Sequence, residues 1–169
     1  ANAEQNLFTG TYGTSMESFV SVSLGGYHGC AVLNDGQVKC WGDNGWGQLG
    51  QGDTSDRGDN SNEMGDNLQA VDLGAGKTAV AVDVQRNNVC AILNDGSVKC
   101  WGDNSHGQLG LGDTQTRGDD PLEMGPHLQS IDLGAGRTAI ALAGTQHSRC
   151  AILNTRDVKC WGKNTDGYL

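Results

Sequence analysis

The sequence has little of what builds membrane-spanning segments or helical domains. It contains no apolar run of about 18 residues, the length that a spanning helix needs, so it predicts no membrane span. No stretch carries a helical stripe of apolar residues between capping residues. Proline is scarce as well, with 2 residues, and aromatic residues make up 5%. The missing helical stripe favours a fold without helices.

Positive charge is also scarce. The chain has 11 lysine and arginine residues against 20 aspartate and glutamate residues, which gives a formal net charge of −9. Such a surface repels phosphate backbones, so we expect no nucleic-acid partner. The charge is explained by solubility, with divalent cations and basic proteins left open as ligands.

What the sequence has in quantity is glycine, 27 residues of 169, placed in register within a repeat of 60 residues. The segment "CAVLNDGQVKCWGDNGWGQLG" at 30–50 returns at 90–110 and begins again at 150. The expected units are 18–77, 78–137 and an incomplete 138–169, preceded by an N-terminal arm, 1–17.

Each complete unit predicts four short strands. In the first unit these are "FVSVSL", "CAVLN", "QVKCW" and "LQAVDLG", which are rich in β-branched residues or alternate with period two. The second and third are joined by Asn34-Asp35-Gly36, a strong hairpin signal in which Gly36 takes positive φ. The chain is therefore expected to be all-β.

The two cysteines of each unit stand opposite one another in this hairpin. Centring the turn on Asp35 pairs Cys30 with Cys40, within disulfide distance if the pair is of the non-hydrogen-bonded kind. A bridge that closes so short a loop contributes about 3 kcal/mol. The predicted disulfides are Cys30–Cys40, Cys90–Cys100 and Cys150–Cys160.

Three local pairs with no cysteine left over favour an oxidising compartment. The alternative is six reduced, buried thiols in a cytosolic protein. Zinc is disfavoured, because ligand pairs usually lie about two to four residues apart and no nearby histidine recurs.

The third hairpin departs from the pattern, with Thr155-Arg156-Asp157 where the others have Asp-Gly. Arg156 at positive φ would cost about 1 kcal/mol. We therefore expect a turn of another type there.

The segment "CAVLNDGQVKCWGDNGWGQLGQGDT" resembles the repeats of the regulator of chromosome condensation family. The likeness covers Trp41-Gly42-Asp43-Asn44 with Gly47-Gln48-Leu49-Gly50, and the same residues 60 positions later. The third copy keeps Trp161, Gly162, Asn164 and Gly167 but has Tyr168-Leu169 in place of Gln-Leu. The paired cysteines look like those of secreted members. Family repeats often carry histidine where His28 stands, but Asn88 and Ser148 hold the equivalent places.

The resemblance implies a β-propeller of four-stranded antiparallel blades, commonly seven. This chain supplies about two and three-quarter blades, whereas seven would need roughly 400 residues at this period. The outer faces therefore need covering. Further repeats of a longer chain would do this, as would copies of the chain in a closed ring or an open filament, because a heterologous contact that fails to close produces a filament.

Several motifs suggest ligand sites but fit the repeat better. "LGAGKTAV" at 73–80 has Val71 where a phosphate loop needs glycine, and a strand rather than a helix follows. Adhesion tripeptides occur twice, as Arg57-Gly58-Asp59 and Arg117-Gly118-Asp119. Because both copies lie at the same place in the repeat, we interpret them as a structural loop.

The acidic loops at 53–67 and 113–127 offer candidate calcium ligands. Alternatively, Arg57 and Arg117 pair with these acids and lock the loops, which we favour. The candidates are Asp53, Asp59, Glu63, Asp113, Asp119 and Glu123.

The sequence offers no catalytic or cofactor site. Its histidines do not recur in register, and no nucleophile stands beside a matching base. The recurring tryptophans are explained by packing. We therefore predict a non-enzymatic extracellular or cell-surface protein whose blades self-assemble. The alternatives are a secreted module that binds a cell-surface protein or a glycan and, last, a guanine-nucleotide exchange factor. The four histidines are His28, His106, His127 and His147.

Overall fold

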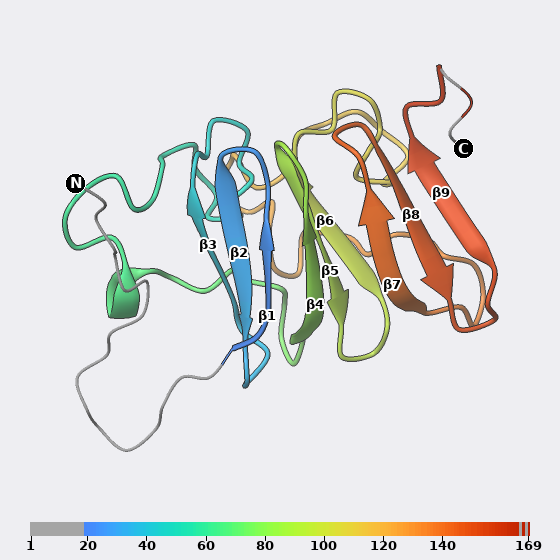
Figure 1. Cartoon of the computed structure of the whole chain (residues 1–169), viewed down its shortest axis with the longest axis horizontal. Coiled ribbons are helices and arrows are strands. Elements are labelled where there is room, and N and C mark those ends of the chain that lie inside the picture. The colour runs from blue at the N-terminus through green and yellow to red at the C-terminus, as the bar shows by residue number, and fades with distance from the viewer. Residues whose placement is uncertain (1–18, 166, 168) are drawn as a thin grey trace.

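The computed structural model describes residues 19–165, 167 and 169, so the predicted arm, 1–17, lies outside the described residues. Within them nine strands form three antiparallel sheets, which stand side by side in chain order (Figure 1). The predicted all-β class is confirmed. We call the sheets blades 1, 2 and 3. Blade 1 contains β1 (Phe19–Leu24), β2 (His28–Leu33) and β3 (Val38–Gly42), and is followed by a short 3-10 helix, η1 (Gly65–Asn67). Blade 2 contains β4 (Ala79–Val84), β5 (Asn88–Leu93) and β6 (Val98–Gly102), and blade 3 contains β7 (Ala139–Gly144), β8 (Ser148–Leu153) and β9 (Val158–Gly162).

The β2–β3 hairpin has the expected register. Cys30 lies opposite Cys40, and Leu33 N–H donates to the Gln37 carbonyl at 2.9 Å. Gly36 has a φ of 81° and closes the turn. The same pairing recurs in blades 2 and 3, so the local sequence determines each hairpin.

The prediction that the third hairpin turns differently is wrong. Arg156 adopts a φ of 69°, and its N–H donates to the Leu153 carbonyl at 2.8 Å, as in the glycine turns. The strand register fixes this conformation, because Ile152 still pairs with Val158. The backbone accepts the strain of about 1 kcal/mol.

The neighbouring blade explains why arginine fits at this turn position in blade 3 but not in blades 1 and 2. A Cβ at Gly36 would lie 2.5 Å from the Cβ of Thr78 in blade 2, and one at Gly96 would lie 2.5 Å from that of Thr138 in blade 3. In the described part of the chain no further blade covers Arg156, which is exposed. Glycine is thus needed at the first two tips for contact as well as for φ.

The expected fourth strand is reduced to one point of pairing. Residues 68–74 run beside β3, where Ala70 and Lys39 form an isolated bridge. Beyond it, the Asp72 side chain accepts the N–H of Gly74 at 2.8 Å. This local side-chain bond competes with the ladder and turns the backbone away. Each described sheet therefore has three strands rather than four.

The hydrophobic core lies between the blades. One buried cluster combines residues of blades 1 and 2, among them Val32, Val38, Val82 and Trp101. A second combines Ile92 and Val98 of blade 2 with residues of blade 3. Each blade thus depends on its neighbours for burial. Among the described residues, no helix is long and apolar enough to span a membrane.

Candidate functional site: the interfaces between blades

One asparagine side chain holds the loop after β3 in its conformation through hydrogen bonds. Buried Asn44 accepts the N–H of Leu49 at 2.9 Å and donates to the Asp53 carbonyl at 2.8 Å. Asn104 makes the equivalent bonds in blade 2. These bonds fix a Gly-Gln-Leu-Gly segment, at 47–50 in blade 1 and 107–110 in blade 2, which we call the glycine turn.

The glycine turn of blade 1 docks on blade 2. The Trp101 indole N–H donates to the Gln48 carbonyl at 3.0 Å. A Cβ on Gly47 would lie 2.3 Å from the backbone nitrogen of Asp119, and one on Gly118 would lie 2.7 Å from the Gly47 carbonyl oxygen. Only glycine permits this approach of the two backbones. We call this filled site the Trp101 pocket.

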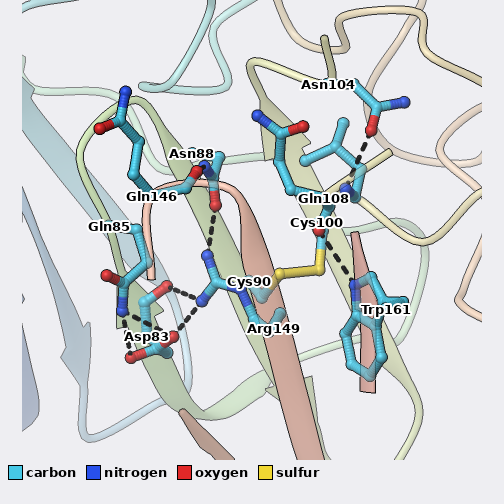
Figure 2. The surroundings of a disulfide bond; sticks show 11 residues. Asp83, Gln85, Asn88, Cys90, Cys100, Asn104, Gln108, Gln146, Arg149 and Trp161 are labelled. Atoms are coloured by element: carbon cyan, nitrogen blue, oxygen red, sulfur yellow. Dashed lines mark hydrogen bonds and ion pairs between the residues drawn. A yellow bond between two sulfur atoms is a disulfide. The ribbon is translucent and has the colours of Figure 1, made fainter. Parts of the chain in front are cut away.

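The next interface repeats the arrangement. The Trp161 indole N–H donates to the Gln108 carbonyl at 3.0 Å, in the glycine turn of blade 2 (Figure 2). Trp101 and Trp161 therefore each pack against the preceding blade, consistent with the interpretation of the recurring tryptophans as packing residues.

Blade 1 carries the corresponding site, and among the described residues no glycine turn lines it. A cavity of about 260 Å³ lies beside Trp41, which is only half-buried, whereas Trp101 is fully buried. Its lining residues correspond, 60 positions earlier, to those around the docked turn in blade 2. We call this cavity the Trp41 pocket. Its lining includes Trp41, Asp43, Arg57, Gly58, Asp59 and Met64.

The outer faces of the array expose residues that the inner faces bury. Val22 is 62% exposed, whereas its counterpart Val82 is 8% exposed; Val158 is 63% exposed, whereas its counterpart Val98 is fully buried. We call the side of a blade that meets the preceding blade its leading face, and the side that meets the following blade its trailing face. Blade 1 has an open leading face, bearing Val22 and Leu24. Blade 3 has an open trailing face, bearing Ile152 and Val158.

A buried ion pair locks blade 3 to blade 2. The guanidinium of Arg149, which is fully buried, contacts the Asp83 carboxylate and donates to the Asp83 carbonyl at 3.0 Å (Figure 2). It also contacts Asn88, which itself donates to the Gln146 carbonyl at 3.1 Å. Burial lowers the pKa of Arg149 to about 10, against the opposing effect of Asp83, and leaves the group charged at neutral pH.

Sequence reasoning missed this lock, although a comparison of the repeats contained the signal. Arg149 stands where blade 2 has Val89, and Asp83 stands where blade 1 has Ser23. Both substitutions introduce charge into strands that are otherwise apolar or neutral. At the blade 1–blade 2 interface, Ser23 Oγ instead accepts the N–H of Val84 at 3.0 Å.

Disulfides join the cysteines in the pairs that the hairpin register predicts. Their Cα atoms lie 4.0 to 4.1 Å apart, and no cysteine in the described residues is free. Each bridge crosses two strands of one blade, so it stiffens that blade without linking it to the next. Three such bonds indicate an oxidising environment. The pairs are Cys30–Cys40, Cys90–Cys100 and Cys150–Cys160.

The acidic loops are locked by their arginines, as the favoured alternative predicts. Arg57 pairs with Asp53 at 2.7 Å, and Arg117 pairs with Asp113 at the same distance. Each guanidinium also donates to carbonyls of its own loop. The arginines of both adhesion tripeptides are therefore engaged within the loop that forms a pocket wall.

The other calcium candidates are spread around the two pockets. Asp59 is exposed and Asp119 lies under the docked turn. Backbone N–H bonds from Gly58 and Asn60 lower the pKa of Glu63. Burial raises the pKa of its counterpart, Glu123. In the described part of the chain, no three acidic, histidine or cysteine side chains gather in an arrangement that could hold a metal ion.

Two histidines that looked unrelated in the sequence meet in the structure. The rings of His106 and His147 make an edge-to-face contact with centroids 4.4 Å apart, across the blade 2–blade 3 interface. His28 is buried between blades 1 and 2, and burial lowers its pKa to about 4 despite the opposing charge of Asp43. These side chains take part in packing between blades.

Comparison with known proteins agrees with this architecture. A model of the regulator of chromosome condensation (RCC1) repeat matches residues 19–48 and 86–108. The ultraviolet-B receptor UVR8 of Arabidopsis thaliana is 34% identical over 154 residues, which are 89% of this chain and 31% of that protein. The probable E3 ubiquitin-protein ligase HERC6 of Homo sapiens is 31% identical over 153 residues, which are 88% of this chain and 13% of that protein.

A solved structure shows the same fold. The chain superposes with a TM-score of 0.64 and 19% identity on a chain in the crystal structure of Kap60 bound to yeast RCC1 (Prp20), covering 90% of this chain and 31% of that one. The chain thus spans less than a third of the length of each of these relatives. The repeat match and the blade architecture together show that this chain belongs to the RCC1 repeat family.

Proposed function

We propose that this chain is a non-enzymatic, extracellular structural protein whose disulfide-pinned blades join copies of the chain head to tail into a ring or filament. The observation that carries the proposal is the pair of open faces. The leading face of blade 1 and the trailing face of blade 3 expose the counterparts of residues that form the two internal interfaces.

The interfaces inside the chain show that a trailing face and a leading face are complementary. Within the chain, a trailing face with Val38 packs on a leading face with Val82. A second copy would offer Val158 to the Val22 of the first in the same way. Each side chain that is fully buried contributes about 1.5–3 kcal/mol, which offsets the entropy lost on association. Contact between unlike faces propagates, so it yields rings or filaments.

The contact between copies is expected to differ from the internal ones at the hairpin tip. Arg156 occupies the place where Gly36 and Gly96 approach the next blade. Its side chain holds the tips apart while the strands below still meet. The difference sets the curvature of the assembly.

Sedimentation velocity of the oxidised protein tests the proposal. The wild type is expected to sediment as species that grow with concentration. Val22→Asp and Val158→Asp each place a charge in the contact and should leave monomers. Val20→Asp is the matched control, because Val20 and its counterpart Val80 are both exposed, and it should assemble like the wild type.

Mixing the two disruptive variants tests the polarity of the contact. Each retains one intact face, so an equimolar mixture should form dimers and nothing larger. A wild type that stays monomeric at every concentration would rule out self-assembly. Dimers of Val158→Asp alone would show that like faces meet.

The extracellular assignment is supported by the three disulfides, which persist in oxidising compartments. The similar ligase HERC6 matches this chain over only 13% of its length. The net charge of −9 disfavours a chromatin-bound exchange factor.

A second candidate is a module that binds another protein or a glycan. It is favoured by the solved RCC1 relative, whose structure is a complex with Kap60. The same open faces would then receive a partner rather than a copy. A wild-type monomer that captures a non-identical extracellular protein, and loses it on Val22→Asp, would support this candidate.

A further inference from the structure

Most positively charged side chains of this acidic chain have a partner within it. Five of the 11 lysine and arginine side chains form ion pairs with aspartates. A lysine in the third strand of each blade donates to a backbone carbonyl instead. In the described part of the chain, the charged groups of the remaining three have neither an acidic nor a backbone partner. These three residues are Arg86, Arg156 and Lys163.

Two of the three, Arg86 and Lys163, lie at the same edge of the blade 2–blade 3 interface. Arg86 is in the turn between β4 and β5, and its guanidinium donates to the Gln146 side chain at 3.3 Å. Gln146 and His147 belong to the turn between β7 and β8. Lys163 follows β9, and its backbone N–H donates to the His147 carbonyl at 2.8 Å. The turn between β7 and β8 is thus the meeting point of both cationic residues.

Two imidazoles stand at the same place. The ring of His147 contacts that of His106, in the loop after β6. Nδ1 of His147 is buried and has no hydrogen-bond partner in the described part of the chain, although buried polar atoms normally have one. Burial lowers the pKa of His147, and the bases around it lower that pKa further, against the opposing charge of Asp103. These bases are His106, Lys163 and Arg86. We call the four side chains the basic edge.

The basic edge is a departure from the repeat. The same four positions at the blade 1–blade 2 interface, 60 residues earlier, hold no basic side chain. They are occupied by Gly26, Trp46, Asn87 and Asp103. That interface closes without positive charge at this edge, so packing between blades does not require the four basic residues. At Lys163 the change even replaces an acid by a base.

From this geometry we propose that the basic edge binds a single doubly charged oxyanion, a sulfate or phosphate group, either free or as a sugar ester. Arg86 and Lys163 supply two permanent positive charges, which match such a group better than a single carboxylate. Both donate charge-assisted hydrogen bonds to anionic oxygens. The net charge of −9 still repels a polyanion, so the site admits one small group and excludes nucleic acid. The site lies within one chain and does not depend on assembly of copies.

Isothermal titration calorimetry of the full oxidised chain with sodium sulfate tests the proposal. The wild type is expected to bind one sulfate. Arg86→Gln and Lys163→Gln should each weaken binding at least about tenfold, because each removes one of the two permanent charges. Arg156→Gln is the matched control. It removes the third unpaired charge, at the exposed hairpin tip on the opposite edge of blade 3, and should bind sulfate like the wild type.

The imidazoles give the site a pH dependence that the same titration measures. Sulfate keeps its charge between about pH 7.5 and about pH 5.5, whereas His106 and His147 gain protons over this range. Affinity for sulfate should therefore rise as the pH falls, with folding checked by circular dichroism at each pH. His147→Asn installs the residue that blade 2 carries at this position, Asn87, and should reduce the rise.

The choice of ligand separates the possible sources of the anion. Tighter binding of glucose 6-sulfate than of sulfate would identify a sugar ester as the ligand, and equal binding would identify the free anion. Acetate that binds as tightly as sulfate would show recognition of a carboxylate and overturn the proposal. So would a wild type that binds no sulfate in the millimolar range, or an equal loss of affinity in Arg156→Gln.

Discussion

The Trp101 pocket and the Trp41 pocket have nearly the same sequence and the same backbone frame, yet their side chains have different surroundings. Trp101 is fully buried by the glycine turn of blade 1, whereas Trp41 is half-buried. Burial raises the pKa of Glu123 beside the Trp101 pocket, while backbone N–H bonds lower the pKa of Glu63 beside the Trp41 pocket. A blade therefore acquires its buried core from the blade beside it.

The largest expected effect is the difference in stability between alanine variants of the two tryptophans. Trp101→Ala should lower the free energy of unfolding by about 3–5 kcal/mol, because it leaves a cavity at the centre of an interface. Trp41→Ala should cost the monomer much less, since its ring is partly in water. Urea denaturation at low protein concentration measures both values. Equal losses would contradict the difference between the pockets.

The disulfides of blades 2 and 3 allow the same comparison between a covered and an open trailing face. Replacing both Cys90 and Cys100 by alanine should cost about 3 kcal/mol or more, from the lost loop constraint and two voids in the core. The same change at Cys150 and Cys160, which are only half-buried, should cost less. Thermal unfolding of the two double variants at one pH provides the check, and the reverse order would count against an open trailing face.

Acid should act first on the blade 1–blade 2 interface. The pKa of buried His28 is about 4 in the folded chain against its usual 6.5, so protons bind the unfolded chain more tightly. Its contribution is complete above pH 6.5 and is lost as pH falls from there through about 4, by up to about 3 kcal/mol.

The control is His28→Asn, which installs the residue that blade 2 carries at this position, Asn88. Urea denaturation between pH 7 and about pH 4 should show a smaller loss of stability for the variant than for the wild type. Parallel curves would show that His28 is not the group responsible.

The smallest effect is expected at the hairpin tips. Arg156→Gly should stabilise the chain by about 1 kcal/mol, because it removes a side chain from a residue at positive φ. Gly96→Arg adds the same strain and also a clash with Thr138, so its cost should exceed that gain. Melting temperatures of the two variants provide the measurement. Equal and opposite shifts would mean that contact with the next blade adds no cost at Gly96.

Much of the fold could be predicted from the sequence because it depends on residues that are close together in the chain. The Asp-Gly turn set the register that pairs Cys30 with Cys40, and the 60-residue period set the number of blades. The fourth strand was overestimated because the side-chain bond from Asp72 to Gly74 interrupts the ladder, a local competition that apolar alternation does not reveal.

The interfaces between blades were harder to predict because they depend on residues far apart in the sequence. In the sequence Gly47 was only part of the repeat motif, and the packed blades show that it admits the backbone of Asp119. Arg149 and Asp83 are 66 residues apart, and their pairing follows from the arrangement of blades rather than from any motif. The conformation of Arg156 was misjudged for the opposite reason, since strand register outweighs the preference of a single residue.

Electron microscopy of the oxidised wild-type chain shows directly whether copies join head to tail. We expect rings or filaments in which blade 3 of one copy abuts blade 1 of the next, so that blades follow one another without a gap across the copy boundary. Isolated three-bladed particles at every concentration would contradict it.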